Sequence, residues 1–111
     1  VRNRQVFYPT YVGAAEKSWG FNSMMRLDKD SGKTDTYSFG EDFRLEEHVL
    51  VAKPGSSREA EGWLVGVGFD VARQQSFATV FDAMNLQAGP IALAHLPYWV
   101  PPCFHGNFHS V

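Results

Sequence analysis

The sequence has little of several features that mark common protein classes. A single cysteine among 111 residues excludes a disulfide framework and a cysteine-rich zinc module, and it favours a reducing compartment, so we expect a cytoplasmic protein. No apolar run approaches the roughly 18 residues of a transmembrane helix, so no transmembrane segment is expected. The 10 Lys and Arg residues oppose 12 Asp and Glu residues without forming a basic stripe. This balance argues against a nucleic-acid partner.

Apolar side chains, by contrast, make up 44% of the chain, and aromatic ones 14%. Their spacing has a period of two: from Trp63 to Val71 the odd positions are bulky, whereas Gly66 and Gly68 lie between them. A period of two is typical of a β-strand, and glycines along one face suit a sheet that another layer approaches closely. The pattern therefore predicts a strand with one bulky face and one thin face.

The same reasoning predicts short strands along the whole chain and no sustained helical pattern. A hairpin turn is expected at 28–33, a second hairpin connection at 71–76 and an exposed loop at 55–62. Short strands at intervals of about ten residues indicate an all-β domain, either a sandwich or a propeller. We find no linker and no second domain. The predicted strands are 19–27, 34–39, 48–52, 63–71, 77–82 and 91–96.

Two glycine-containing motifs have simple structural explanations. The segment from Asp28 to Gly32 resembles the start of a calcium loop, but its glycine comes one residue early and the twelfth position is Phe39 rather than Glu. It is predicted to be a hairpin turn. Gly66 and Gly68 lack the third glycine and the following helix of a dinucleotide-binding fingerprint, so they indicate close packing of layers.

His105 is the first candidate site residue. It lies between Pro102 and Gly106, and a stiff entry followed by glycine would hold the imidazole in one direction. Such rigidity suits a metal ligand, although a half-buried histidine bonded to a backbone carbonyl explains the pattern equally well. Cys103, His105 and His109 do not make a zinc site by themselves, because no fourth ligand stands at a recognisable spacing.

Glu46 and Glu47 form the second concentration of ionisable groups, immediately before the apolar segment 49–51. Either both carboxylates lie on the solvated surface, or one of them stands at a strand end and turns toward the interior. A carboxylate that accepts the Nδ1–H of a metal-bound histidine orients the ring and raises its basicity. Spacing alone does not pair Glu47 with His105, because 58 positions separate them.

Six short segments occur in order along the chain: EHVLVA (47–52), EGWL (61–64), FATVFDA (77–83), GPIA (89–92), LP (96–97) and VPPCFHG (100–106). In this order they resemble the C-terminal region of the carotenoid cleavage oxygenase family. The resemblance is strongest to the microbial branch that cleaves lignostilbene and isoeugenol. Two positions depart from the family pattern: His48 stands where proline is usual, and Cys103 stands where glycine is frequent.

The resemblance implies that residues 1–111 are the C-terminal part, about two blades, of a single seven-bladed β-propeller domain. In this family iron(II) is held by four histidines on the propeller axis. His105 matches the last of these ligands, and Glu47 matches a glutamate that supports a ligating histidine. The other three ligands would lie upstream, and none of His48, His95 and His109 falls on a ligand position.

The implied function is that of a non-haem iron(II) dioxygenase. It would use O2 to cleave a conjugated alkene, stilbenoid or apocarotenoid, into two carbonyl products, with Fe(II) as its cofactor. Its partners would be O2, a hydrophobic or phenolic alkene and the remainder of its own polypeptide. Residues 1–111 alone are expected to be inactive, because one recognisable ligand does not complete the site. The alternative is a metal-free β-propeller-type interaction module, and upstream histidines would discriminate between the two.

Overall fold

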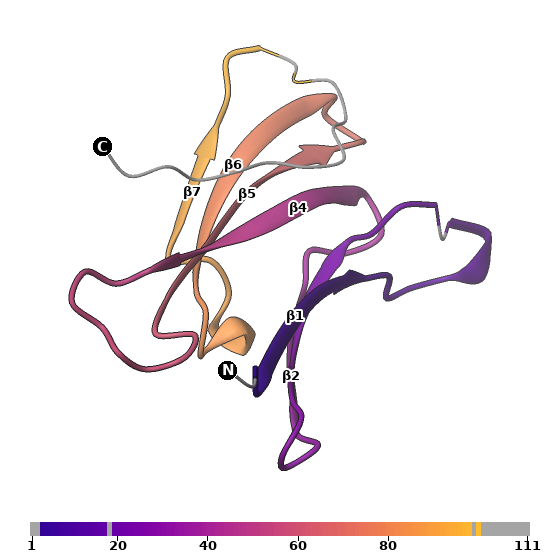
Figure 1. Ribbon diagram of the computed structural model, residues 1–111. Coiled ribbons are helices and arrows are strands. Elements are labelled where there is room, and N and C mark those ends of the chain that lie inside the picture. Colours follow the sequence, from indigo (N-terminus) through magenta and orange to yellow (C-terminus); the bar gives the residue numbers. More distant parts are fainter. Residues whose placement is uncertain (1–2, 18, 99, 101–111) are drawn as a thin grey trace.

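The computed structural model describes residues 3–17, 19–98 and 100, and these residues form two antiparallel sheets (Figure 1). One sheet has three strands in the order β1-β2-β3, and the other has four in the order β4-β5-β6-β7. The all-β prediction is confirmed, and no helix of the described residues is long and apolar enough to cross a membrane. The elements are β1 (Gln5–Thr10), η1 (Ala15–Lys17), β2 (Ser23–Asp28), β3 (Thr34–Ser38), β4 (Phe43–Ala52), β5 (Gly62–Asp70), β6 (Gln75–Asp82), η2 (Leu86–Ala88) and β7 (Ala92–His95).

The hairpins lie where the sequence predicts them, and the differences concern strand ends. The turns at 28–33 and 71–74 join β2 to β3 and β5 to β6. The strand predicted at 48–52 begins earlier, at Phe43, whereas the one predicted at 19–27 begins later, at Ser23. β1 has no counterpart among the predicted strands. It is an edge strand that contains Pro9, and an edge position tolerates a residue without an N–H donor.

The turn between β2 and β3 is closed by the carboxylate of Asp28. Its Oδ1 accepts the backbone N–H groups of Asp30 at 3.0 Å and Ser31 at 3.3 Å, and Gly32 adopts a φ of +73°. Arg4 donates from Nε at 2.8 Å and from Nη2 at 2.7 Å to the two carboxylate oxygens. These hydrogen bonds from Arg4 hold the pKa of Asp28 well below its usual range. The predicted hairpin turn is confirmed.

The thin face of β5 is the face that packs into the core. A Cβ atom on Gly66 would clash with the imidazole of His48, and one on Gly68 would clash with the ring of Phe77. The glycines therefore make room for rings from the neighbouring strands β4 and β6. The bulky odd-numbered face is less covered, and Val65 on it remains 37% exposed.

The hydrophobic core lies where the two sheets meet. Aromatic rings carry the contact: Tyr37 and Phe39 of the three-stranded side lie with ring centroids 5.1 Å apart, and Phe39 lies 5.5 Å from Phe77 of β6. Offset and edge-on contacts of this kind are favourable beyond the area that they bury. The fully packed core consists of Met24, Leu45, Leu64, Phe77, Phe81, Ala83 and Leu86.

A polar link also joins the sheets. Asp35 of β3 accepts the N–H of Leu86 at 2.7 Å and that of Gln87 at 2.9 Å, so it binds the start of η2. The Asp35 carboxylate also lies 3.7 Å from Nη2 of Arg26. Because η2 follows β6, this carboxylate fixes the position of the three-stranded sheet against the four-stranded one.

Candidate functional site

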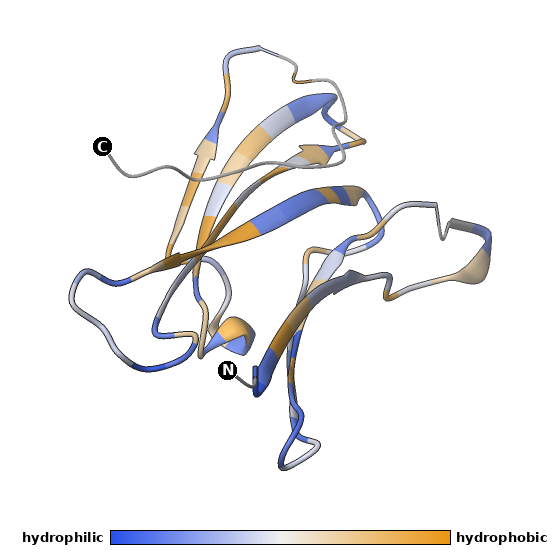
Figure 2. Cartoon of the chain, in the orientation of Figure 1, coloured by the Kyte–Doolittle hydropathy of each residue, from blue (hydrophilic) through white to orange (hydrophobic). Residues whose placement is uncertain are grey.

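Glu46 and Glu47 lie in a β-bulge in the first half of β4. Leu45 pairs with Gly68 of β5 and His48 pairs with Gly66, so two residues of β4 oppose the single residue Val67. Leu45 and His48 are both buried, whereas Glu46 is half-buried and Glu47 is exposed. Figure 2 shows this hydrophilic stretch of β4 ahead of its hydrophobic second half. Bulges recur beside active sites because they redirect side chains.

The prediction that Glu47 stands at a strand end is wrong, since β4 continues back to Phe43. A longer strand was not predicted, because Glu46 and Glu47 interrupt the apolar alternation of this segment. In the structure the bulge accommodates that interruption within one strand. The carboxylate of Glu47 is consequently presented from the middle of a paired strand, which is a more rigid support than a loop.

His48, next to the bulge, is a structural residue. Nδ1 lies 2.9 Å from the carbonyl oxygen of Glu46, and Nε2 lies 2.8 Å from Oγ1 of Thr79. A carbonyl only accepts, so Nδ1–H is the donor and Nε2 accepts the Thr79 hydroxyl proton. Burial lowers the pKa of His48 and favours this neutral ring. Both ring nitrogens are therefore engaged within the protein.

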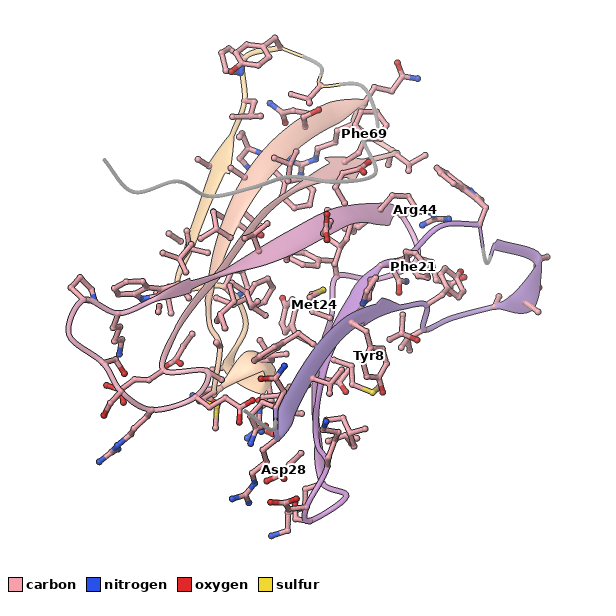
Figure 3. All side chains as sticks on the ribbon, in the orientation of Figure 1. Tyr8, Phe21, Met24, Asp28, Arg44 and Phe69 are labelled. Atoms are coloured by element: carbon pink, nitrogen blue, oxygen red, sulfur yellow. The ribbon has the colours of Figure 1, made fainter. Side chains whose placement is uncertain are left out.

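A groove runs beside the bulge, between β4 and the β1–β2 hairpin. Its volume is about 460 Å³ and its wall is mainly aromatic and aliphatic. Figure 3 shows Tyr8, Phe21, Met24 and Arg44 on the elements that border it. The lining residues are Phe7, Tyr8, Pro9, Trp19, Gly20, Phe21, Met24, Arg44, Leu45, Glu46, Glu47, His48 and Phe69.

Arg44 gives this groove a fixed positive charge. Its guanidinium carbon lies 4.1 Å from the ring centroid of Trp19 and 5.5 Å from that of Tyr11. Its Nη1 donates to the carbonyl oxygens of Glu41 at 2.7 Å and Phe43 at 2.6 Å. Sequence reasoning missed Arg44, because the rings that stack on it come from a distant segment and leave no local pattern.

The metal-ligand prediction for His105 lies outside the described residues, as do Cys103 and His109. Within the described part of the chain, no group of three or more His, Cys, Asp or Glu side chains could hold a metal ion. The last described residue, Val100, donates its N–H to Oγ of Ser76 at 2.8 Å. The segment that leads to His105 is therefore attached to β6 five residues before the histidine.

Curated proteins similar to this chain are oxygenases. The chain is 29% identical over 101 residues to the apocarotenoid-15,15'-oxygenase of Synechocystis, and 30% identical over 87 residues to the lignostilbene-alpha,beta-dioxygenase isozyme III of Sphingomonas paucimobilis. It is 33% identical over 85 residues to a carotenoid cleavage oxygenase of Mycobacterium tuberculosis. These alignments cover 88%, 78% and 77% of this chain, but 21%, 18% and 17% of the relatives. The chain thus spans about a fifth of the length of the curated relatives that it matches.

Solved structures show the same fold. Cobalt-substituted Synechocystis apocarotenoid oxygenase matches with a TM-score of 0.87 at 23% identity, over 99% of this chain and 23% of that chain. Pseudomonas brassicacearum lignostilbene dioxygenase matches with a TM-score of 0.80 at 20% identity, over 94% and 23%. These neighbours are seven-bladed propellers, so the predicted propeller fold is confirmed.

A family profile described as retinal pigment epithelial membrane protein matches residues 1–110, which is nearly the whole chain. The order of the short motifs, the two sheets and the oxygenase relatives agree with that match. The chain belongs to the retinal pigment epithelial membrane protein family, which is the family of the carotenoid cleavage oxygenases.

Proposed function

We propose that this chain is the C-terminal part of a non-haem iron(II) dioxygenase that cleaves a conjugated alkene. The reaction would consume one alkene and one O2, break the C=C bond and form two carbonyl groups. All atoms of both reactants enter the two products, so no external reductant is needed. The substrate class is that of the similar proteins, whose names specify lignostilbene and apocarotenoids.

In this proposal His105 is one of the iron ligands and Glu47 supports a ligating imidazole. Iron(II) held by neutral imidazoles would supply the one-electron chemistry that O2 activation requires. Glu47 would accept the N–H of the imidazole, fix its orientation and raise its basicity. One solved relative in cobalt-substituted form is consistent with a metal in this fold.

The observation that carries the proposal is the presentation of Glu47 within reach of the segment that leads to His105. Val100 is attached to Ser76, which pairs with Phe69, and the bulge faces Val67, two residues before Phe69 in β5. Two strand spacings and two residues along a strand amount to about 12 Å. Five extended residues span at most ~17 Å, so the chain is long enough to bring an imidazole to this carboxylate.

The groove beside Glu47 fits the proposed substrate class. Its wall offers the rings of Phe7, Phe21 and Phe69, and such surfaces bind planar conjugated molecules through apolar contact. The same wall excludes water from a hydrophobic chain that lies along it. This chain's own side chains would thus contribute apolar binding surface and support for one iron ligand.

The test uses the complete polypeptide that carries this chain, reconstituted with iron(II) under anaerobic conditions. We expect about one iron per molecule and O2-dependent formation of two carbonyl products from a stilbene or an apocarotenoid. His105→Ala should abolish both iron retention and product. His109→Ala is the matched control, because it removes a nearby imidazole that matches no ligand position.

Full iron occupancy in the His105→Ala protein would contradict the assignment of the ligand. A complete wild-type protein that binds no iron and cleaves neither substrate would contradict the proposed function and would favour the metal-free interaction module. Metal analysis and product chromatography separate these outcomes.

A further inference from the structure

Ser76 is a buried residue that accepts hydrogen bonds from both ends of the segment 96–100. Its carbonyl oxygen accepts the N–H of Leu96 at 2.9 Å, and its Oγ accepts the N–H of Val100 at 2.8 Å. Ser76 is fully buried, at 0% exposure, and lies near the start of β6. One serine thus closes the loop that follows β7 and sets where the chain leaves the four-stranded sheet.

The two contacts of Ser76 differ in what they require from its side chain. The bond from Leu96 goes to the backbone, so it extends the pairing of β6 with β7 and survives substitution of the serine. The bond from Val100 goes to the hydroxyl oxygen, and a side chain without an acceptor removes it. Of these two hydrogen bonds, only the one from Val100 therefore depends on the side chain of Ser76.

The two residues that follow Val100 restrict the backbone beyond the anchored residue. Residues 101 and 102 are both proline, each of which fixes its own φ, and a residue that precedes proline is driven away from the helical region. Val100 is thus followed by two residues whose φ is fixed, and His105 comes three positions after the second proline.

We infer that Ser76 is a positioning residue for His105, holding the start of its segment in the conformation that metal binding needs. This inference rests on the proposed iron-ligand role of His105. In this role the hydroxyl oxygen would act through the segment and would not be a metal ligand. It reduces the conformational freedom that the segment must lose when the imidazole coordinates, and preorganisation of this kind strengthens binding.

The experiment compares the complete polypeptide with its Ser76→Ala and Ser76→Thr variants. Iron(II) affinity is measured by competition with a chromophoric chelator, and the exchange rate of the Val100 amide is followed by hydrogen–deuterium exchange. We expect Ser76→Ala to weaken iron binding by about 3- to 10-fold, the range that one neutral hydrogen bond is worth, and to accelerate exchange at Val100. Ser76→Thr keeps the hydroxyl and should restore both.

Ser23→Ala is the matched control. Ser23 is also 0% exposed and its hydroxyl also makes one hydrogen bond, to Oδ1 of Asn22 at 2.8 Å, but it lies in the other sheet. An equal loss of thermal stability in both alanine variants, with iron affinity lowered only in Ser76→Ala, supports positioning. If Ser76→Ala does not fold, Ser76→Cys replaces it, because sulfur has similar volume and is a weak acceptor.

Unchanged iron affinity in a folded Ser76→Ala or Ser76→Cys protein would overturn the inference while leaving the iron site intact. Equal loss of affinity in Ser23→Ala would also overturn it, because the effect would then follow general stability. A wild-type protein that binds no iron would overturn the proposed function, and this inference with it.

Discussion

Removal of the Asp35 carboxylate should loosen the contact between the two sheets. The effect can be measured as faster hydrogen exchange of individual backbone amides. Asp35→Ala deletes the acceptor of two backbone N–H groups, those of Leu86 and Gln87. It also removes the negative partner of Arg26, whose side chain is only 15% exposed. η2 would then keep its apolar contacts but lose its polar attachment to β3.

The size of the effect depends on whether each N–H finds another hydrogen-bond acceptor once the Asp35 carboxylate is removed. Gln87 is exposed, so its amide can bond to water, whereas Leu86 is fully buried and its amide has no such replacement. A buried donor left without an acceptor costs about 1–3 kcal/mol, and a bond to a charged acceptor lies toward the upper part of that range. A local loss of about 2 kcal/mol corresponds to roughly 30-fold faster exchange of the Leu86 amide.

Hydrogen–deuterium exchange of the complete polypeptide, with peptides across 83–90, measures this rate. Asp35→Asn should give a smaller acceleration, because it keeps one carbonyl oxygen. Asp82→Ala is the matched control: Asp82 accepts the N–H of Met84 at 3.0 Å in an exposed turn and does not join the sheets. If exchange at Leu86 in Asp35→Ala stays within about 3-fold of wild type, the carboxylate does not hold the sheets together and the reasoning fails.

Three further predictions concern the bulge and its surroundings. Glu47→Gln should weaken iron binding by about 10- to 100-fold in the complete polypeptide, whereas Glu46→Gln should not; the opposite result would shift the supporting carboxylate by one residue. Gly66→Ala should lower the free energy of unfolding by about 1–3 kcal/mol in urea titrations, because the added methyl group meets the imidazole of His48, and a His48→Ala background should reduce that loss. Burial lowers the pKa of His48 below 6.5, so the unfolded chain binds its proton first as the pH falls. Stability should therefore decline below about pH 6.5 by at most ~1.4 kcal/mol per pH unit, and denaturation midpoints of a His48→Gln variant should lack that decline.

The sequence predicted the parts of the fold that local chemistry determines. Alternation from Trp63 to Val71 predicted β5, and Asp28 with Gly32 predicted the turn before β3, because both patterns depend on neighbours in sequence. β1 escaped prediction, since its pairing with β2 and not its own pattern makes it a strand. Pairing with β2, and not the intrinsic strand propensity of residues 5–10, thus makes this segment a strand.

In the candidate site, too, the features that local sequence determines were predicted and those that depend on distant partners were not. The sequence singled out Glu47 through its motif, but the bulge that presents it depends on register against β5, which no local pattern encodes. Arg44 and Ser76 were missed for the same reason, because the partners that give them a role lie 24 or more residues away along the chain. His105 remains a prediction, carried by its motif and by the attachment of Val100.

The bulge in β4 has a consequence for insertions and deletions. Leu45 and His48 face the core although two residues separate them, and removal of one of those residues would restore ordinary alternation with both side chains still facing the core. The packing of the sheet therefore does not require the extra residue. The chain could lose one position here without turning either half of the strand over, so a deletion at this place would change the chemistry presented to the groove and leave the hydrophobic core unchanged.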